Sequence, residues 1–147
     1  MRLPFLPGRR LTRTRIEAAL AELLAEHPDY DVRPHWDESG DGALAIVLDR
    51  RGRATVGTTE RGITRDPHVV TDMDHVLYHA MNHATFIAAM KEEMRTRTAH
   101  PGPDPFQRLL AIHRERLARI RPHWGERRRR EQERLGLLAR PGPDPTA

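Results

Sequence analysis

The stretch "ALAIVLDRRGRATVGTTE" (residues 43–60) determines the fold class, because two strand-like runs flank a short turn. Residues 43–49 form an almost continuous apolar run between glycine-containing segments, which is typical of a well-buried strand. Residues 53–60 follow a turn of about three residues, so the two runs are expected to form an antiparallel hairpin. Residues 30–37 alternate loosely in polarity and predict a third strand, placed at a sheet edge because Pro34 has no N–H to donate.

Helical periodicity is found on both sides of these strands. Residues 14–27 carry apolar side chains at helical spacing, and Thr14 and Glu17 have the spacing of a capping box. Residues 61–70 are interpreted as a loop, followed by a helix capped by Thr71 that extends to about Thr98. The apolar face of this helix is predicted to contain Met73, Val76, Leu77, Ala80, Ala84, Ile87 and Ala88.

Two more helices are predicted towards the C-terminus. One spans residues 105–120, and the other starts after Pro122 and covers about residues 123–138. The buried stripe of the first is expected to contain Phe106, Leu109, Leu110, Ile112, His113, Leu117 and Ile120. Because strands and helices are segregated along the chain, the predicted class is α+β: a small three-stranded antiparallel sheet with an N-terminal helix and about three C-terminal helices.

Length and composition limit the domain organisation. A chain of 147 residues has room for one modest core, and we expect a single domain over residues 11–139, a flexible arm over 1–10 and a disordered tail over 140–147. The absence of cysteine excludes disulfides, thiolate metal sites and cysteine nucleophiles. Neither a signal-peptide run nor a membrane span is recognised in the sequence, so a cytoplasmic protein without a membrane partner is expected.

Charge is distributed unevenly along the chain. Residues 28–80 contain ten acidic side chains and six arginines, whereas residues 105–140 contain eleven arginines and four glutamates. This difference bears on encounter with partners and on solubility, and it gives no information about the fold.

Three histidines are spaced four residues apart in the helix predicted after residue 71. His75, His79 and His83 would lie along one side of that helix, and two imidazoles at i and i+4 can bind zinc. The H-E-x-x-H form of zinc proteases is absent, however, and the apolar face of the helix is centred elsewhere. The favoured interpretation is a flank that packs against a neighbouring helix, without metal or another cofactor; a metal-dependent enzyme and a pH-sensitive role remain alternatives.

The arginine run "ERRRREQER" (126–134) raises the possibility of nucleic-acid binding. Residues four apart predict the ion pairs Glu126–Arg130, Arg127–Glu131 and Arg129–Glu133 on a mostly solvated helix face, so nucleic acid is the less favoured partner. The chain has no G-x-S-x-G motif, and its single serine, Ser39, falls in a turn-like segment, so the sequence gives no support for nucleophilic catalysis.

An ordered series of short motifs resembles the immunity protein 63 family of bacterial polymorphic-toxin systems. The motifs are "ERG" (60–62), "TDMD" (71–74), "VLY" (76–78), "TF" (85–86), "EEMRTR" (92–97), "DPFQR" (104–108) and "PHWGER" (122–127). The chain departs from the pattern at His113, where a glutamine is expected, and in the proline-rich segment before Asp104. Order and spacing carry the resemblance, which covers roughly the C-terminal half.

The resemblance implies a cytoplasmic, non-enzymatic protein that binds a cognate toxin and blocks it by occlusion. Its motif residues are candidates for the scaffold: Glu60, Arg61, Gly62, Asp72, Asp74, Tyr78, Phe86, Glu93, Arg97 and Trp124. As a hypothesis, Glu93 pairs with Arg97 and the Glu60–Arg61 corner docks against that pair, with Tyr78 and Trp124 covering the junction. The toxin would bind the acidic segment 29–49 if it is basic, or the arginine-rich helix if it is acidic; oligomeric state is not predicted.

Overall fold

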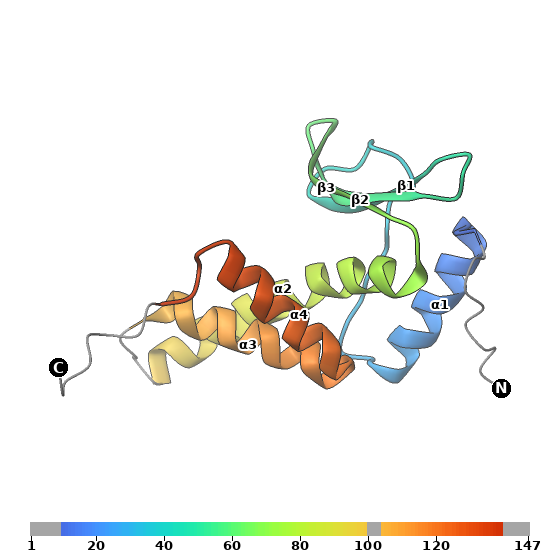
Figure 1. Ribbon diagram of the computed structural model, residues 1–147. Coiled ribbons are helices and arrows are strands. Elements are labelled where there is room, and N and C mark those ends of the chain that lie inside the picture. The colour runs from blue at the N-terminus through green and yellow to red at the C-terminus, as the bar shows by residue number, and fades with distance from the viewer. Residues whose placement is uncertain (1–9, 100–103, 140–147) are drawn as a thin grey trace. The chain divides into compact units, whose positions relative to one another are not determined.

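The computed structural model describes residues 10–99 and 104–139 and has the predicted α+β class (Figure 1). Its elements are α1 (Arg13–Glu26), β1 (Ala43–Leu48), β2 (Ala54–Glu60), β3 (Ile63–Val70), α2 (Met73–Ala99), α3 (Pro105–Ile120) and α4 (Pro122–Arg134). Two compact units, Met1–His83 and Ala84–Ala147, divide the chain at a point inside α2. That residues 11–139 form one domain stays a prediction, and the predicted arm and tail lie outside the described residues apart from Arg10.

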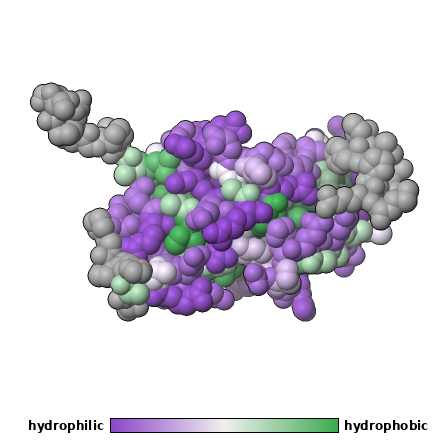
Figure 2. All heavy atoms as spheres, turned by 90° about the horizontal axis from the view of Figure 1, so that it is seen from below, coloured by the Kyte–Doolittle hydropathy of each residue, from purple (hydrophilic) through white to green (hydrophobic). Residues whose placement is uncertain are grey.

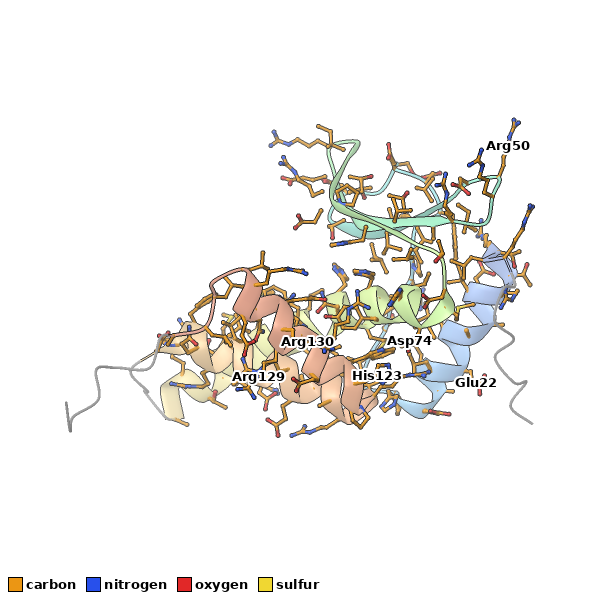
Figure 3. All side chains as sticks on the ribbon, in the orientation of Figure 1. Glu22, Arg50, Asp74, His123, Arg129 and Arg130 are labelled. Carbon is orange, nitrogen blue, oxygen red and sulfur yellow. The ribbon has the colours of Figure 1, made fainter. Side chains whose placement is uncertain are left out.

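The predicted hairpin supplies two of the three strands of the sheet in the first unit, with β2 at the centre. The strand order is β1-β2-β3, and β1 pairs antiparallel with β2 from Ala43 opposite Thr59 to Leu48 opposite Ala54. The turn between them is held by Asp49, whose Oδ1 accepts hydrogen bonds from the backbone N–H groups of Arg51 (2.8 Å) and Arg53 (3.0 Å). Arg50 extends from this turn, away from the sheet (Figure 3).

The third strand is not the one predicted. Residues 63–70 form β3, so the interpretation of 61–70 as a loop was wrong. In the predicted strand 30–37 only His35 pairs, through an isolated parallel bridge to Ala45. The reason lies in the backbone: Pro34 offers no N–H, whereas β3 is held to β2 by ladder hydrogen bonds although most of its side chains are exposed. An exposed edge strand needs no alternation of apolar and polar residues, so residues 63–70 lack the sequence pattern by which a strand is predicted.

The motif "ERG" makes the β2–β3 turn. Arg61 (φ +53°) and Gly62 (φ +78°) are the two central residues, and positive φ at both is the requirement of a type I′ hairpin turn. Glycine at position 62 adopts this conformation without steric cost. The ladder shifts register at Gly57, where a Cβ atom would lie 2.5 Å from Thr64 Cγ2 and 2.8 Å from the Arg65 carbonyl oxygen. Glycine at this position lets the two strands approach through the bulge.

Two helix starts differ from prediction by one or two residues. α1 is capped by Thr12, whose side chain accepts from the Arg15 N–H (3.2 Å), and Thr14 lies inside the helix. At α2 the cap is Asp72, whose Oδ1 accepts from the His75 N–H (3.0 Å), and not Thr71. In both cases the side-chain oxygen bonds to the N–H three residues further on, which is the geometry that satisfies a free donor at a helix N-terminus.

Replacing the cap of α2 gives a direct test of this assignment. Asp72→Ala is expected to lower the free energy of unfolding by about 1 kcal/mol, because an N-cap hydrogen bond is lost. Thr71→Ala is the matched control and should change it by less than about 0.5 kcal/mol, the range of ordinary surface substitutions. Urea denaturation followed by circular dichroism measures both. A larger loss of unfolding free energy for Thr71→Ala would indicate that Thr71, and not Asp72, is the N-cap.

The cores of the two units differ in composition. In the first unit the N-terminal half of α2 is buried on nearly every side, through Val76, Leu77, Tyr78, Ala80 and Met81. The remaining buried apolar residues of this unit are Leu11, Ile16, Leu20, Leu23, Val32, Leu44, Ala45, Ile46, Ala54, Val56, Val70 and Met73. The second unit buries fewer apolar side chains and includes polar ones, among them Thr85, Glu93, His113 and Gln132.

In the second unit α3 has the predicted bounds, Pro105–Ile120. Leu110, His113 and Leu117 are buried as predicted, but Phe106 is about half exposed, which corrects its assignment to the buried stripe. Phe106 lies in the first turn of the helix, beside the N-cap Asp104, and is less enclosed there than the residues at mid-helix. No helix within the described residues is long and apolar enough to cross a membrane.

Candidate functional site

The predicted scaffold residues are divided between the two units. Glu60, Arg61, Gly62, Asp72, Asp74 and Tyr78 belong to the first, and Phe86, Glu93, Arg97 and Trp124 belong to the second. Whether the Glu60–Arg61 corner docks against the Glu93–Arg97 pair, with Tyr78 and Trp124 at the junction, therefore stays a prediction. Tyr78 and Trp124 are both fully buried.

In the first unit the β2–β3 turn is tied to the preceding acidic loop. The Arg61 backbone N–H donates to Asp41 Oδ1 (3.3 Å), and Thr64 Oγ1 donates to Glu38 Oε1 (3.0 Å). Glu60 forms an ion pair with Arg65 across the turn (3.3 Å). These contacts give the "ERG" corner a structural role, because they tie the hairpin to the loop that precedes β1.

The three histidines of α2 have separate environments. His75 Nδ1 lies 2.8 Å from Asp72 Oδ2, and the His79 ring stacks on His68 of β3 with centroids 4.5 Å apart. Burial lowers the pKa of His83. His79 thus contacts a strand, a neighbour that the expected packing against a helix did not include. In the described part of the chain no three His, Cys, Asp or Glu side chains are grouped so that they could hold a metal ion.

In the second unit the motif "EEMRTR" supplies two ion pairs. The buried carboxylate of Glu93 accepts two hydrogen bonds from Arg97, from Nε (3.1 Å) and from Nη2 (2.7 Å), which confirms the pair predicted from the spacing. The adjacent Glu92 pairs with Arg116 of α3 (2.8 Å). A ring contact between Phe86 and His113, with centroids 5.4 Å apart, also joins α2 to α3. No local pattern indicates the Glu92–Arg116 pair, because its partners are distant along the chain.

The Glu93 pair makes stability depend on pH. The hydrogen bonds from Arg97 lower the pKa of Glu93 and outweigh burial, which acts in the opposite direction; the positive charge of Arg108 adds to the lowering. A carboxyl whose pKa is lower in the folded state stabilises the fold above its unfolded pKa of about 4.3, and this stabilisation is lost as the pH falls through the folded value.

Glu93→Gln is therefore expected to reduce the acid sensitivity of folding. The variant should be less stable than the wild type at pH 7, and the difference should shrink as the pH is lowered below about 4.3. Glu126→Gln, at an exposed position of α4, is the control. The midpoints of urea unfolding are measured from pH 7 to pH 3 for the wild type and both variants. Parallel pH profiles of the wild type and Glu93→Gln would contradict a pH-dependent stabilisation by Glu93.

The α3–α4 hairpin depends on residues that the sequence did not single out. Gly125 of α4 is buried, and a Cβ atom there would lie 2.5 Å from Ala118 Cβ and 3.0 Å from the Arg114 carbonyl oxygen. Gln132 is fully buried; its Oε1 accepts from Arg114 (2.6 Å) and its Nε2 donates to the Leu110 carbonyl oxygen (3.4 Å). A glycine at a helix contact and a buried glutamine carry no periodic signal, so only the structure identifies them.

The arginines of α4 are less available to a ligand than the sequence suggested. Arg127 and Arg128 are 27% and 16% exposed, and both bond to Glu131 at 3.0 and 3.1 Å. Arg129 lies on the same helix and pairs with Glu133 at 3.4 Å (Figure 3). The predicted ion pairs Arg127–Glu131 and Arg129–Glu133 are confirmed. Arg127 and Arg128 are partly buried, so the expectation of a solvated face is corrected for these two residues.

A stripe of exposed apolar side chains follows one side of α2 in the second unit. Ile87 and Met90 are each 37% exposed and Met94 is 66% exposed, so the prediction that Ile87 lies on the buried face was wrong. The spacing of three and four residues places the three on one side of the helix. We call these residues the α2 stripe. The face of the molecule drawn in Figure 2 is mostly hydrophilic, with small apolar areas.

Comparison with known proteins gives one family match. Residues 53–134 match the model of a family described as immunity protein 63, and this span runs from the sheet to the end of α4. Neither the curated proteins nor the solved structures give a match.

Proposed function

Because this chain belongs to the immunity protein 63 family, we propose that it binds a cognate bacterial toxin and neutralises it by occlusion, without catalysing a reaction. The family match is the observation that carries the proposal, since it includes more than half of the chain and parts of both units. We further propose that the protein acts in the bacterial cytoplasm, where a polymorphic toxin would otherwise reach its target.

The contacts of the second unit support a binding role. Glu92–Arg116, Glu93–Arg97 and Phe86–His113 fix the C-terminal half of α2 and its contact with α3. A surface held in its bound conformation before the partner arrives loses less conformational entropy on binding. A protein that acts by occlusion benefits from this, because its inhibition depends on affinity alone.

Co-expression tests the proposal. A candidate toxin, chosen from the genes that neighbour this one, is expressed in a susceptible bacterium with and without the chain, and we expect growth only when the chain is co-expressed. Persistent killing, with this chain accumulating in folded form, would contradict toxin neutralisation. Wild-type chain and toxin are then mixed at increasing molar ratios, and inhibition is expected to be complete near stoichiometric amounts, without a change in toxin mass. Inhibition by a small fraction of an equivalent would indicate catalysis instead.

A nucleic-acid-binding role is the alternative, and the charge of the second unit favours it. Residues 84–147 contain fourteen basic and eight acidic side chains, a net charge of +6. The engagement of Arg127, Arg128 and Arg129 with glutamates reduces the number of arginines that could contact phosphates. Binding to generic duplex DNA and RNA, measured over a salt series, separates the two roles, because phosphate contacts give steep salt dependence.

A further inference from the structure

We propose that the α2 stripe is the toxin-docking surface, and that the toxin presents to it an apolar patch bordered by carboxylates. This inference rests on the proposed immunity function and adds the surface and the chemistry of its partner. It replaces both surfaces suggested by sequence, the acidic segment 29–49 and the arginine-rich α4.

The stripe is not needed to pack the unit to which it belongs. The opposite side of α2 supplies the buried residues, with Thr85 and Ala89 fully buried and Glu93 nearly so. Of the seven large apolar side chains exposed within the described residues, three belong to the stripe, in a stretch of about two helical turns. Exposed apolar side chains gathered in one place are typical of interaction sites, whereas single ones are ordinary. Two of the three are methionines, whose flexible side chains adapt to a partner surface.

Charge indicates the character of the partner. Lys91 is exposed and lies four residues after Ile87, on the flank of the stripe, and the second unit as a whole has a net charge of +6. A docking partner with carboxylates around an apolar centre would match both the apolar stripe and the positive charge of the second unit. Its carboxylates would also attract it to this unit before contact. A basic toxin surface would instead be repelled by the unit.

The rival surfaces are engaged in holding the fold. In segment 29–49, Asp37 bonds to Ser39, Asp49 holds its turn, and Glu38 and Asp41 bond to the β2–β3 hairpin.

The edge strand β3 is a further candidate surface, because it exposes Ile63 and Val69, but Asp66 has a φ of +47° and is followed by Pro67. A left-handed residue and a proline in an edge strand interrupt the regular backbone that an added strand would need.

Matched substitutions test the surface. The probe is the candidate toxin of the co-expression test, carrying an inactivating substitution and titrated against the full-length chain by calorimetry. Met94→Glu is compared with Leu135→Glu, because both side chains belong to the second unit and are 66% and 61% exposed. Met94→Glu should weaken binding by about 30-fold or more, as for a central apolar contact, and Leu135→Glu by less than about threefold. Equal effects of the two would overturn the assignment.

A charge reversal tests the predicted carboxylates. Lys91→Glu should lower the association rate by about tenfold at low salt, with a smaller effect at high salt, because steering is screened. Faster association of this variant would overturn the acidic character of the partner. If the wild type binds and both Met94→Glu and Lys91→Glu bind equally well, the docking surface is wrong while the immunity function stands. If the wild type does not bind this toxin, the proposed function itself fails. Sedimentation of the chain alone provides a further test, since a dimer that Met94→Glu dissociates would make the stripe a self-association surface and overturn the inference.

Discussion

Trp124→Ala is expected to lower the free energy of unfolding by about 3–5 kcal/mol, the usual cost of deleting a large buried aromatic side chain. Trp124 is the largest fully buried side chain within the described residues, and its ring contacts Arg121, whose Cζ lies 5.0 Å from the ring centroid, and His123. The second unit buries few apolar side chains, so its neighbours offer little to refill the cavity. A small domain is stable by only about 5–15 kcal/mol, and a large part of that would be lost.

The control for this variant is Trp36→Ala. Trp36 is half-buried in the first unit, where the Arg13 guanidinium lies over its ring at 5.1 Å. Its removal should therefore cost less than half as much. Urea denaturation followed by circular dichroism compares the two, and equal costs would show that Trp124 does not anchor the second unit.

Gly125→Ala is expected to lower the free energy of unfolding by about 1–3 kcal/mol, the usual cost of inserting a methyl group into a well-packed contact. The sign is informative, because alanine at an exposed helical position would stabilise the helix by about 1 kcal/mol relative to glycine. At Gly125 the new methyl group would meet Ala118 Cβ at 2.5 Å, so α4 must move away from α3. Thermal and urea unfolding measure the change, and a gain in stability would show that the two helices are not in close contact.

A second substitution distinguishes this clash from a general loss of stability. Ala118→Gly removes the Cβ atom that the new methyl group would meet. Combined with Gly125→Ala, Ala118→Gly should recover part of the lost stability. Introduced alone, Ala118→Gly weakens α3, because glycine has a lower helix propensity than alanine. A coupling energy of about 1 kcal/mol or more in the double-mutant cycle is expected for residues in contact. Additive effects would contradict the contact.

The correct predictions concern features recorded locally in the sequence. The β1–β2 hairpin was visible as two runs around a short turn, and α3 was bounded by prolines at both ends. The Glu93–Arg97 pair followed from a spacing of four residues. In each case the residues that determine the feature are neighbours along the chain.

The errors concern features that depend on distant partners. β3 exists because β2 lies beside it, and its own exposed sequence, interrupted by Pro67, has no strand periodicity. Ile87 was assigned to the core because it continues the apolar face around Val76 and Ala80, but the buried side of α2 changes along the helix. No local pattern records which side of a long helix meets its neighbours. The α2 stripe was missed for the same reason.

The single helix α2 restricts how this protein can be divided for experiments. It contains 27 residues, a length of about 40 Å, and the boundary between the units falls inside it. A chain cut after His83 would expose free backbone carbonyl groups on one fragment and free N–H groups on the other. It would also separate the α2 stripe from the helical turns that precede it. Shortened versions made to test the proposed binding of a toxin should therefore begin before the cap at Asp72, so that the helix retains its natural start.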